Sequence, residues 1–351
     1  MENLKQKNSK NIFKEILVGK WSFFWKIPGI FYLVIFVVDF FEVFFKDIGL
    51  LFLRNSNFSW IDSYLVSPEQ WEFLVLGYER IFLETGIFLL VHQLLYLIVV
   101  LLFIFIVDRY TRDDIGLAFD LKSVFLVFGG ILFATFVLSL FILVLFTTGN
   151  FEYNGFTRGD EFVVGNIKSV LTIQATLFIV VSFQEELLAR AYFLNLLKGI
   201  GRFGSVIFSS IIFALLHMGN IAVTIEKGFW ETILDFFLLR LTIDSYFGVF
   251  NIFLLAILFA VYFVYFKDLW FLIGAHFMWN FYMGSVWGMT VSHIESLKGS
   301  LIDTQLTGSA LMTGGGFGPE GSIIITAILG IIMFFVIRKI RKVSKNEIAA
   351  D

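Results

Sequence analysis

The chain has 351 residues, of which 58% are hydrophobic and only 16% are charged, and its mean hydropathy is +0.86. Soluble domains are about 45–50% apolar and about 25% charged, so this composition excludes an ordinary soluble domain. The net charge of −3 argues against a nucleic-acid partner, and the absence of cysteine excludes disulfides, thiolate nucleophiles and cysteine-ligated metals. The class that remains is a membrane protein with several spans.

A helix needs about 18–25 mostly apolar residues to cross the hydrocarbon core of a bilayer. The chain contains three prolines, which suits long and mostly unbroken helices. Candidate spans, the last of them short, lie at residues 28–45, 87–107, 124–147, 169–191, 206–224, 249–266, 269–289 and 323–337. Only Lys267 and Asp268 separate the sixth and seventh spans, which implies a tight helical hairpin. The sequence therefore predicts an all-α fold, a polytopic membrane helix bundle of about eight transmembrane helices.

The basic residues predict the orientation of this bundle. If both termini are cytoplasmic, the inner segments hold 17 of the 26 Lys and Arg residues and the outer loops hold 8. Cytoplasmic loops of membrane proteins carry an excess of Lys and Arg, so this count favours that orientation. The one basic residue left, Arg190, lies inside a span. We therefore expect a multi-pass protein of the cell membrane with both termini in the cytoplasm.

The fourth span carries ionisable side chains, which are costly in hydrocarbon and mark a functional site by default. These side chains are Glu185, Glu186 and Arg190. On a helix, Glu186 and Arg190 are i and i+4 and can pair, whereas Glu185 points about 100° away. The spacing predicts that the arginine anchors Glu186 and that Glu185 exchanges protons.

Two further spans contribute polar side chains at helical spacing. The fifth carries His217, and the seventh carries His276 and Asn280, which share one helix face as i and i+4. A glutamate and a histidine from neighbouring helices can hold and deprotonate a water molecule. An imidazole and a carboxamide on one face can hold an oxyanion. Because three spans contribute, we interpret the set as a candidate catalytic site rather than a structural polar cluster.

Other polar residues have simpler explanations. We interpret His92, in the second span, as a group that hydrogen-bonds between helices, and His293 as an interfacial residue. Asp39 and Glu42 could form a second acid site, but a polar groove or a neighbouring helix end is the favoured explanation. The glycine-rich stretch 314–321 is interpreted as a flexible loop, since no Lys-Ser or Lys-Thr follows, as a phosphate-binding loop requires.

Three motifs occur in order along the chain: Glu185-Glu186-x-x-x-Arg190, Phe213-x-x-x-His217 and His276-x-x-x-Asn280. Together they resemble the CPBP family (CAAX protease and bacteriocin-processing, also called Abi) of intramembrane endopeptidases. That family includes the prenyl-protein CAAX endopeptidases of eukaryotes. The resemblance covers about residues 113–337, and the stretches 112–117 and 318–321 are similar to bacterial members.

The resemblance implies an all-helical membrane bundle with a catalytic cavity inside it. Glu185 would be the general base on a water molecule that His217 also holds. Glu186 and Arg190 would orient this arrangement. We expect residues 111–337 to form this catalytic core. Residues 1–110 would supply a cytoplasmic segment, two transmembrane helices and an interfacial outer loop, and residues 338–351 a basic cytoplasmic tail.

The resemblance further implies that His276 and Asn280 stabilise the tetrahedral oxyanion. A metal bound by the glutamates and histidines has also been suggested for the family, and Glu, His, His and water would suit zinc. However, the sequence contains no His-Glu-x-x-His motif, and Asn280 would be a poor zinc ligand. We favour a metal-free glutamate mechanism without a cofactor, and zinc or another divalent metal is the alternative.

Three functions stay open. The first is a CAAX-protease-like membrane endopeptidase, a hydrolase that cleaves a membrane-associated peptide or protein with glutamate- and histidine-activated water. The second is a non-catalytic membrane scaffold or a peptide-binding or immunity protein that uses the same cavity. The third, a transporter, suits Asp39, Glu42 and His92 better, but no internal repeat is visible.

The expected partners are the lipid bilayer and a peptide or membrane-anchored protein substrate, with no nucleic acid. Residue usage rich in Phe, Ile and Lys without Cys is typical of a bacterial protein. Peptide pheromones, signal-peptide remnants and bacteriocin precursors are all compatible substrates. The sequence indicates no oligomeric state.

Overall fold

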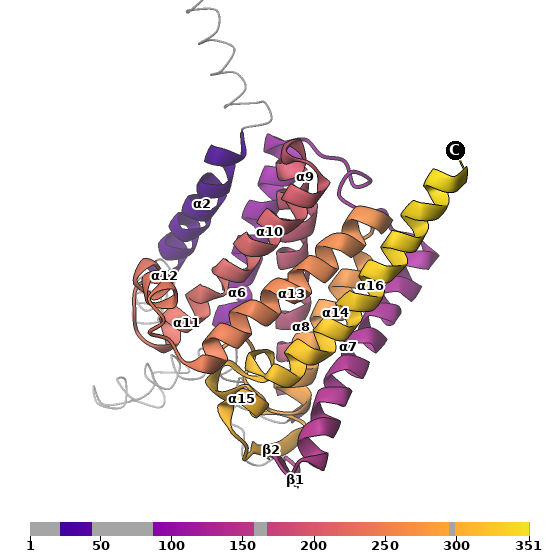
Figure 1. Cartoon of the computed structure of the whole chain (residues 1–351). Coiled ribbons are helices and arrows are strands. Elements are labelled where there is room, and N and C mark those ends of the chain that lie inside the picture. The colour runs from indigo at the N-terminus through magenta and orange to yellow at the C-terminus, as the bar shows by residue number, and fades with distance from the viewer. Residues whose placement is uncertain (1–21, 44–86, 158–166, 295–298, 351) are drawn as a thin grey trace, which may run out of the picture. The chain divides into compact units, whose positions relative to one another are not determined.

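The computed structural model describes residues 22–43, 87–157, 167–294 and 299–350 (Figure 1). These residues form two compact units. The first comprises the described parts of residues 1–111 and 158–185, and the second comprises those of residues 112–157 and 186–351. Each unit is described by itself below.

The first unit is helical. It contains α2 (Phe23–Val43), α6 (Ile87–Leu102), the π-helical continuation η2 (Phe103–Val107) and α8 (Ile167–Glu186), whose final residue begins the second unit. Helices α2 and α6 pack against each other. Lys26, expected to precede the first span, instead lies in the first turn of α2 and pairs with Asp108. The helix can begin this early because the carboxylate neutralises the nearly buried ammonium.

The second unit is built on five long helices: α7 (Leu121–Thr147), α10 (Arg202–Leu216), α13 (Ile243–Phe266), α14 (Trp270–Phe281) and α16 (Ile323–Ala350). Shorter helices connect them: η3 (Leu187–Phe193), α9 (Leu194–Leu197), η4 (Lys198–Ile200), α11 (Met218–Thr224), α12 (Phe229–Phe237), η5 (Tyr282–Val286), α15 (Ala310–Thr313), η6 (Gly315–Phe317) and η7 (Pro319–Gly321). Its hydrophobic core joins η3, α10, α11, α13 and η6.

Within the described residues, strands β1 (Phe151–Phe156) and β2 (Ile302–Leu306) are the exception to the helical fold. They pair antiparallel, with Phe151 opposite Leu306 and an irregularity between Tyr153 and Gly155. The strands belong to the two connections that follow α7 and precede α15 (Figure 1). Their backbone groups satisfy each other, which is what a short segment outside a helix requires.

Six helices in the described part of the chain are long and apolar enough to cross a membrane: Leu90–Val107, Leu121–Thr147, Val170–Ile200, Arg202–Ala222, Ile243–Phe266 and Ile323–Lys342. They correspond to six of the eight predicted spans. The first predicted span is represented by a shorter apolar helix, Phe23–Val34. The seventh is divided between α14 and the π-helix η5, so its α-helical part is too short to qualify alone. The expected helical bundle is confirmed.

The short connection between α13 and α14 follows from its two polar residues. Lys267 adopts a left-handed conformation with φ of +51°, which ends α13. The Asp268 carboxylate then accepts hydrogen bonds from the backbone N–H groups of Trp270 at 2.9 Å and Phe271 at 3.3 Å. A side chain that satisfies the first N–H groups of a helix fixes where that helix begins.

Helices α7 and α14 approach each other so closely that their backbones touch (Figure 1). A Cβ atom on Gly130 would lie 2.0 Å from the Phe271 carbonyl oxygen, and one on Gly274 would lie 2.3 Å from the Val127 oxygen. Only glycine permits this contact, since neither distance leaves room for a carbon atom. The contact fixes the position of α14, which carries His276 two residues after Gly274.

The glycine contact predicts that Gly274→Ala destabilises the protein. The added methyl group must push α7 and α14 apart, at a cost of about 1–3 kcal/mol, as for other overpacked sites. Thermal unfolding of the detergent-solubilised protein should show a lower midpoint. Gly330→Ala on α16 is the matched control, because a Cβ atom there meets nothing within 4 Å. An unchanged midpoint for Gly274→Ala would contradict the backbone contact.

Candidate active site

The candidate site of the second unit is centred on the Glu186 carboxylate, which is fully buried. His276 Nδ1 lies 2.8 Å from Glu186 Oε1, and Arg190 Nε lies 3.1 Å from Oε2. The contact with His276 is a hydrogen bond, whereas the contact with Arg190 is an ion pair that lacks hydrogen-bond alignment. The Glu186 carboxylate thus contacts the Arg190 guanidinium and the His276 imidazole, which come from different elements.

Arg190 lies in the π-helix η3, which follows α8 directly and is buried along its whole length. Its guanidinium carbon lies 4.5 Å from the centre of the Phe213 ring and 5.6 Å from that of Phe259. A buried arginine is costly unless it is paired, and here a carboxylate and two aromatic faces surround it. The predicted pair of Glu186 and Arg190 is present.

His217 caps the C-terminal end of α10, and its Nδ1 lies 2.9 Å from the Phe213 carbonyl oxygen. A carbonyl only accepts hydrogen bonds, so Nδ1 carries the proton and a neutral ring keeps its lone pair on Nε2. The Phe213 ring also lies 4.8 Å from the His217 ring and 6.5 Å from the His276 ring. One aromatic ring therefore contacts Arg190 and both histidines.

His276 and Asn280 lie on one face of α14, with 9% and 7% of their surface exposed. Glu186 contacts Nδ1 of His276, and Nε2 is the second nitrogen of this ring. No hydrogen bond joins the Asn280 carboxamide to any residue that the structure describes. The two side chains therefore share one helix face, as an oxyanion pair requires.

Glu185 precedes Glu186 on α8 and is half-buried. It is the last residue of the first unit, whereas Glu186, Arg190, His217, His276 and Asn280 all belong to the second. The distances above therefore join Glu186, Arg190 and His276 and do not include Glu185. A water molecule shared by Glu185 and His217 stays a prediction.

A second buried carboxylate, Glu320, escaped the sequence analysis. Its Oε1 accepts a hydrogen bond from Trp279 Nε1 at 3.0 Å, and its Oε2 accepts one from Ser292 Oγ at 2.5 Å. Asn251 on α13 donates to the backbone carbonyl of Glu320 at 2.6 Å. Trp279 directly precedes Asn280, so Glu320 anchors the part of α14 that carries the candidate oxyanion groups. The signal in the sequence that could have identified Glu320 is its position as a carboxylate inside the stretch 318–321.

The glycine-rich stretch 314–321 differs from the flexible loop that was expected. It folds into η6 and η7, and Phe317 within it is fully buried. Gly314 and Gly318 adopt φ values of +92° and +90°, and a Cβ atom on Gly314 would lie 1.8 Å from the Gly318 carbonyl oxygen. The Phe317 N–H donates to Asp244 at 3.1 Å. Glycine serves here for close backbone packing and not for mobility.

The structure describes the side chains of two of the remaining polar candidates, His293 and His92. The His293 ring meets the Phe317 ring edge-to-face, with centroids 5.7 Å apart, and the backbone N–H of His293 donates to the Phe317 carbonyl. His92 is half-buried on α6 in the first unit. Asp39 and Glu42 belong to α2, but their side chains lie outside the described residues.

Among the residues that the structure describes, no three His, Asp or Glu side chains come together as metal ligands would. Glu186 is engaged by Arg190 and His276, and each histidine uses its Nδ1 for a protein contact.

Comparison with known proteins identifies the same region. Residues 167–282 match the family model described as Rce1-like, type II CAAX prenyl endopeptidase. No curated protein and no solved structure gives a match. The matched range begins with α8 and ends one residue after α14, so it contains all six predicted site residues. With six long apolar helices in its described residues, the chain is a helical membrane protein whose residues 167–282 are similar to the Rce1-like type II CAAX prenyl endopeptidases.

Proposed function

We propose that this protein is an intramembrane endopeptidase that hydrolyses a peptide bond in a membrane-associated peptide or protein. The match to a CAAX-type protease family supports the reaction class. The single observation that carries the mechanism is the buried Glu186 carboxylate, which contacts both Arg190 and His276. It holds a histidine in one orientation beside Asn280, as a preorganised oxyanion site requires.

The nucleophile in this mechanism is a water molecule. Glu185 accepts a proton from the water while His217 Nε2 accepts a hydrogen bond from its second O–H group. The Nδ1–H bond of His217 to the Phe213 carbonyl supports this role, because it fixes the tautomer that leaves Nε2 as the acceptor. The water oxygen then forms a bond to the carbonyl carbon of the substrate.

The tetrahedral intermediate carries negative charge on the former carbonyl oxygen. Protonated His276 donates from Nε2 and Asn280 donates from its amide, so two hydrogen bonds meet that charge. Glu186 stabilises the imidazolium through Nδ1, and Arg190 keeps the buried carboxylate in place. Glu185 returns its proton to the leaving nitrogen as the C–N bond breaks, which yields an amine and a carboxylic acid that releases its remaining proton to solvent.

The site needs water within the membrane, so the helices must line a hydrated cavity. We also propose that the protein lies in the cell membrane with both termini in the cytoplasm, as the distribution of Lys and Arg suggests. In that orientation Glu185 and His276 both lie in the cytoplasmic half of their helices. A peptide would enter from the cytoplasm or laterally from the lipid.

The general-base role predicts that Glu185→Gln abolishes peptide cleavage. The amide keeps the shape of the side chain but cannot accept the proton, so the rate should fall by at least about 100-fold. The assay uses purified protein in liposomes with a quenched library of prenylated and signal-like peptides. Glu152→Gln on β1 is the control, because Glu152 is an exposed carboxylate away from the site. Full activity of Glu185→Gln would favour a non-catalytic peptide-binding protein.

The variant His217→Asn distinguishes the structural role of Nδ1 from the proposed catalytic role of Nε2. The asparagine amide replaces Nδ1 and keeps the bond to the Phe213 carbonyl, but no atom replaces Nε2. We expect normal thermal unfolding together with a loss of about 100-fold in kcat/KM. His293→Asn is the matched control, since asparagine tolerates the positive φ of +69° at that position. Equal activities of the two variants would exclude a role for Nε2.

The metal-free mechanism predicts that a chelator leaves cleavage unchanged. Purified protein would be treated with EDTA and with 1,10-phenanthroline, dialysed and assayed on the same peptides. Loss of activity that added zinc restores would replace the proposed glutamate mechanism by a metal-dependent one. Membrane abundance and thermal unfolding are measured in parallel, so that unfolding is not mistaken for metal loss.

A further inference from the structure

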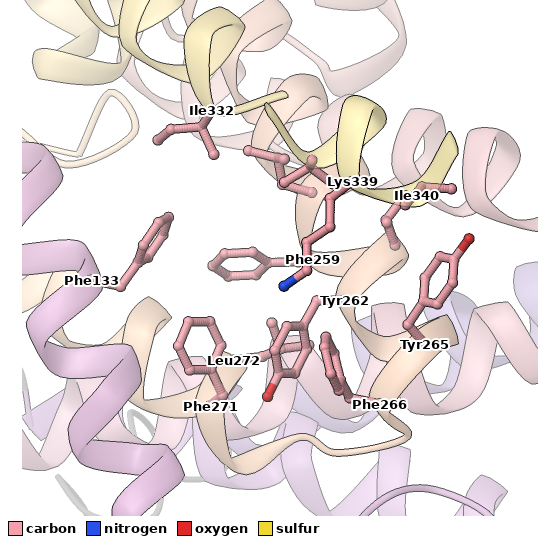
Figure 2. Close-up of a pocket in the computed structure, with 13 residues that line it drawn as sticks. Phe133, Phe259, Tyr262, Tyr265, Phe266, Phe271, Leu272, Ile332, Lys339 and Ile340 are labelled. Carbon is pink, nitrogen blue, oxygen red and sulfur yellow. The ribbon is translucent and has the colours of Figure 1, made fainter. Parts of the chain in front are cut away.

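An apolar pocket of about 340 Å³ lies within the second unit, apart from the candidate active site (Figure 2). Four helices line it, α7, α13, α14 and α16, mostly with aromatic and aliphatic side chains. On α13 the lining runs from Leu258 to Phe266, and on α16 from Ile332 to Ile340. Eight residue steps on a helix span about 12 Å, so the pocket is a slot parallel to the helices.

One end of the slot lies at the C-terminal ends of α13 and α16, where Phe266 and Ile340 line it. Their N-terminal ends are joined by hydrogen bonds, from Asn251 to the Ser322 carbonyl at 3.0 Å and from Thr326 to Asn251 at 2.8 Å. The two helices therefore start side by side, and Phe266 and Ile340 lie at the opposite end. The apolar stretch of α16 gives way to basic residues at that end, as it does where a helix leaves the hydrocarbon.

Lys339 is the one charged residue that lines the slot. Figure 2 shows its side chain extending into the pocket, with the nitrogen directed toward the interior. No ion pair links Lys339 to a carboxylate in the described residues. The same end of the unit is rich in other cations, since Lys267 follows Phe266. Burial and the nearby cations Lys198 and Arg202 lower the pKa of Lys267. An ammonium group directed into an apolar slot calls for an anion that carries a hydrocarbon chain.

We propose that the slot binds an anionic phospholipid, with one acyl chain between α7, α13, α14 and α16 and the phosphate against Lys339. In a bilayer the hydrocarbon chain gains little by transfer, because its surroundings are equally apolar. It gains the dispersion contacts that an empty slot would forfeit. The charge of Lys339 therefore determines the selectivity for the lipid headgroup, whereas the slot binds the acyl chain.

The bound lipid would touch the wall of the candidate active site. Phe259 lines the slot, and the centre of its ring lies 5.6 Å from the guanidinium carbon of Arg190. A chain in the slot supports this ring from the opposite side. Lipid binding itself does not depend on peptide cleavage, so it can be tested whether or not the protein is a protease.

The test measures lipid binding by native mass spectrometry of the full-length protein in detergent, titrated with phosphatidylglycerol or phosphatidylcholine. We expect tighter binding of phosphatidylglycerol, and about fivefold weaker binding of this lipid to Lys339→Gln, as for the loss of one basic contact. Lys342→Gln is the matched control: it removes a cation from the same helix that does not line the slot. Val336→Trp fills the slot and should lower the occupancy of both lipids.

Each other outcome would overturn the proposal. Equal weakening by Lys339→Gln and Lys342→Gln would mean diffuse attraction to a basic helix end. Equal binding of both lipids to the parent protein would remove the role of the charge. Unaltered binding to Val336→Trp, with normal thermal unfolding, would remove the role of the slot. Displacement by inorganic phosphate alone would show an anion site without an acyl chain.

Discussion

The cost of burying charge in an apolar interior governs the arrangement around Glu186. Its carboxylate is fully buried, and it is tolerated because Arg190 and His276 approach its two oxygens. Arg190 in turn needs the aromatic faces of Phe213 and Phe259. Removal of Glu186 or of Arg190 would leave the other charge uncompensated in the interior. The same requirement that stabilises the second unit therefore holds α10, α13 and α14 in register around the site.

The sequence was sufficient where the relevant information is local. Apolar stretches predicted six spans that the described helices match, and the i, i+4 spacing of Glu186 and Arg190 predicted their pairing. The contact between Glu186 and His276 joins residues 90 positions apart, so only the three-motif resemblance linked them. The π-helix η3 could not be foreseen, because its extra residue per turn depends on packing around Arg190 rather than on local propensity. The proton-transfer role of Glu185 stays a prediction.

The glycine-rich stretch before α16 shows why composition alone misled. Glycines and polar residues outside a span are typical of flexible loops, yet here the glycines allow backbone contacts that bury Phe317 and Glu320. Glu320 lies 41 residues after Trp279, and its partners come from α13, α14 and the connection between η5 and β2. A glutamate with three distant partners, two at its carboxylate and one at its backbone carbonyl, leaves no periodic pattern in the sequence. Its importance becomes visible only when the helices are assembled.

The position of Glu320 in the chain has a consequence for biosynthesis. A membrane protein is made from its N-terminus, so α8, α10 and α14 emerge before the segment that contains Glu320. Until then, the indole N–H of Trp279 lacks its carboxylate acceptor, and the helix that carries His276 and Asn280 lacks its anchor. The short helix η7, which is synthesised after α14, thus supplies the anchor of this helix. A nascent chain halted before Glu320 would hold all six predicted site residues and still lack the contact that fixes two of them.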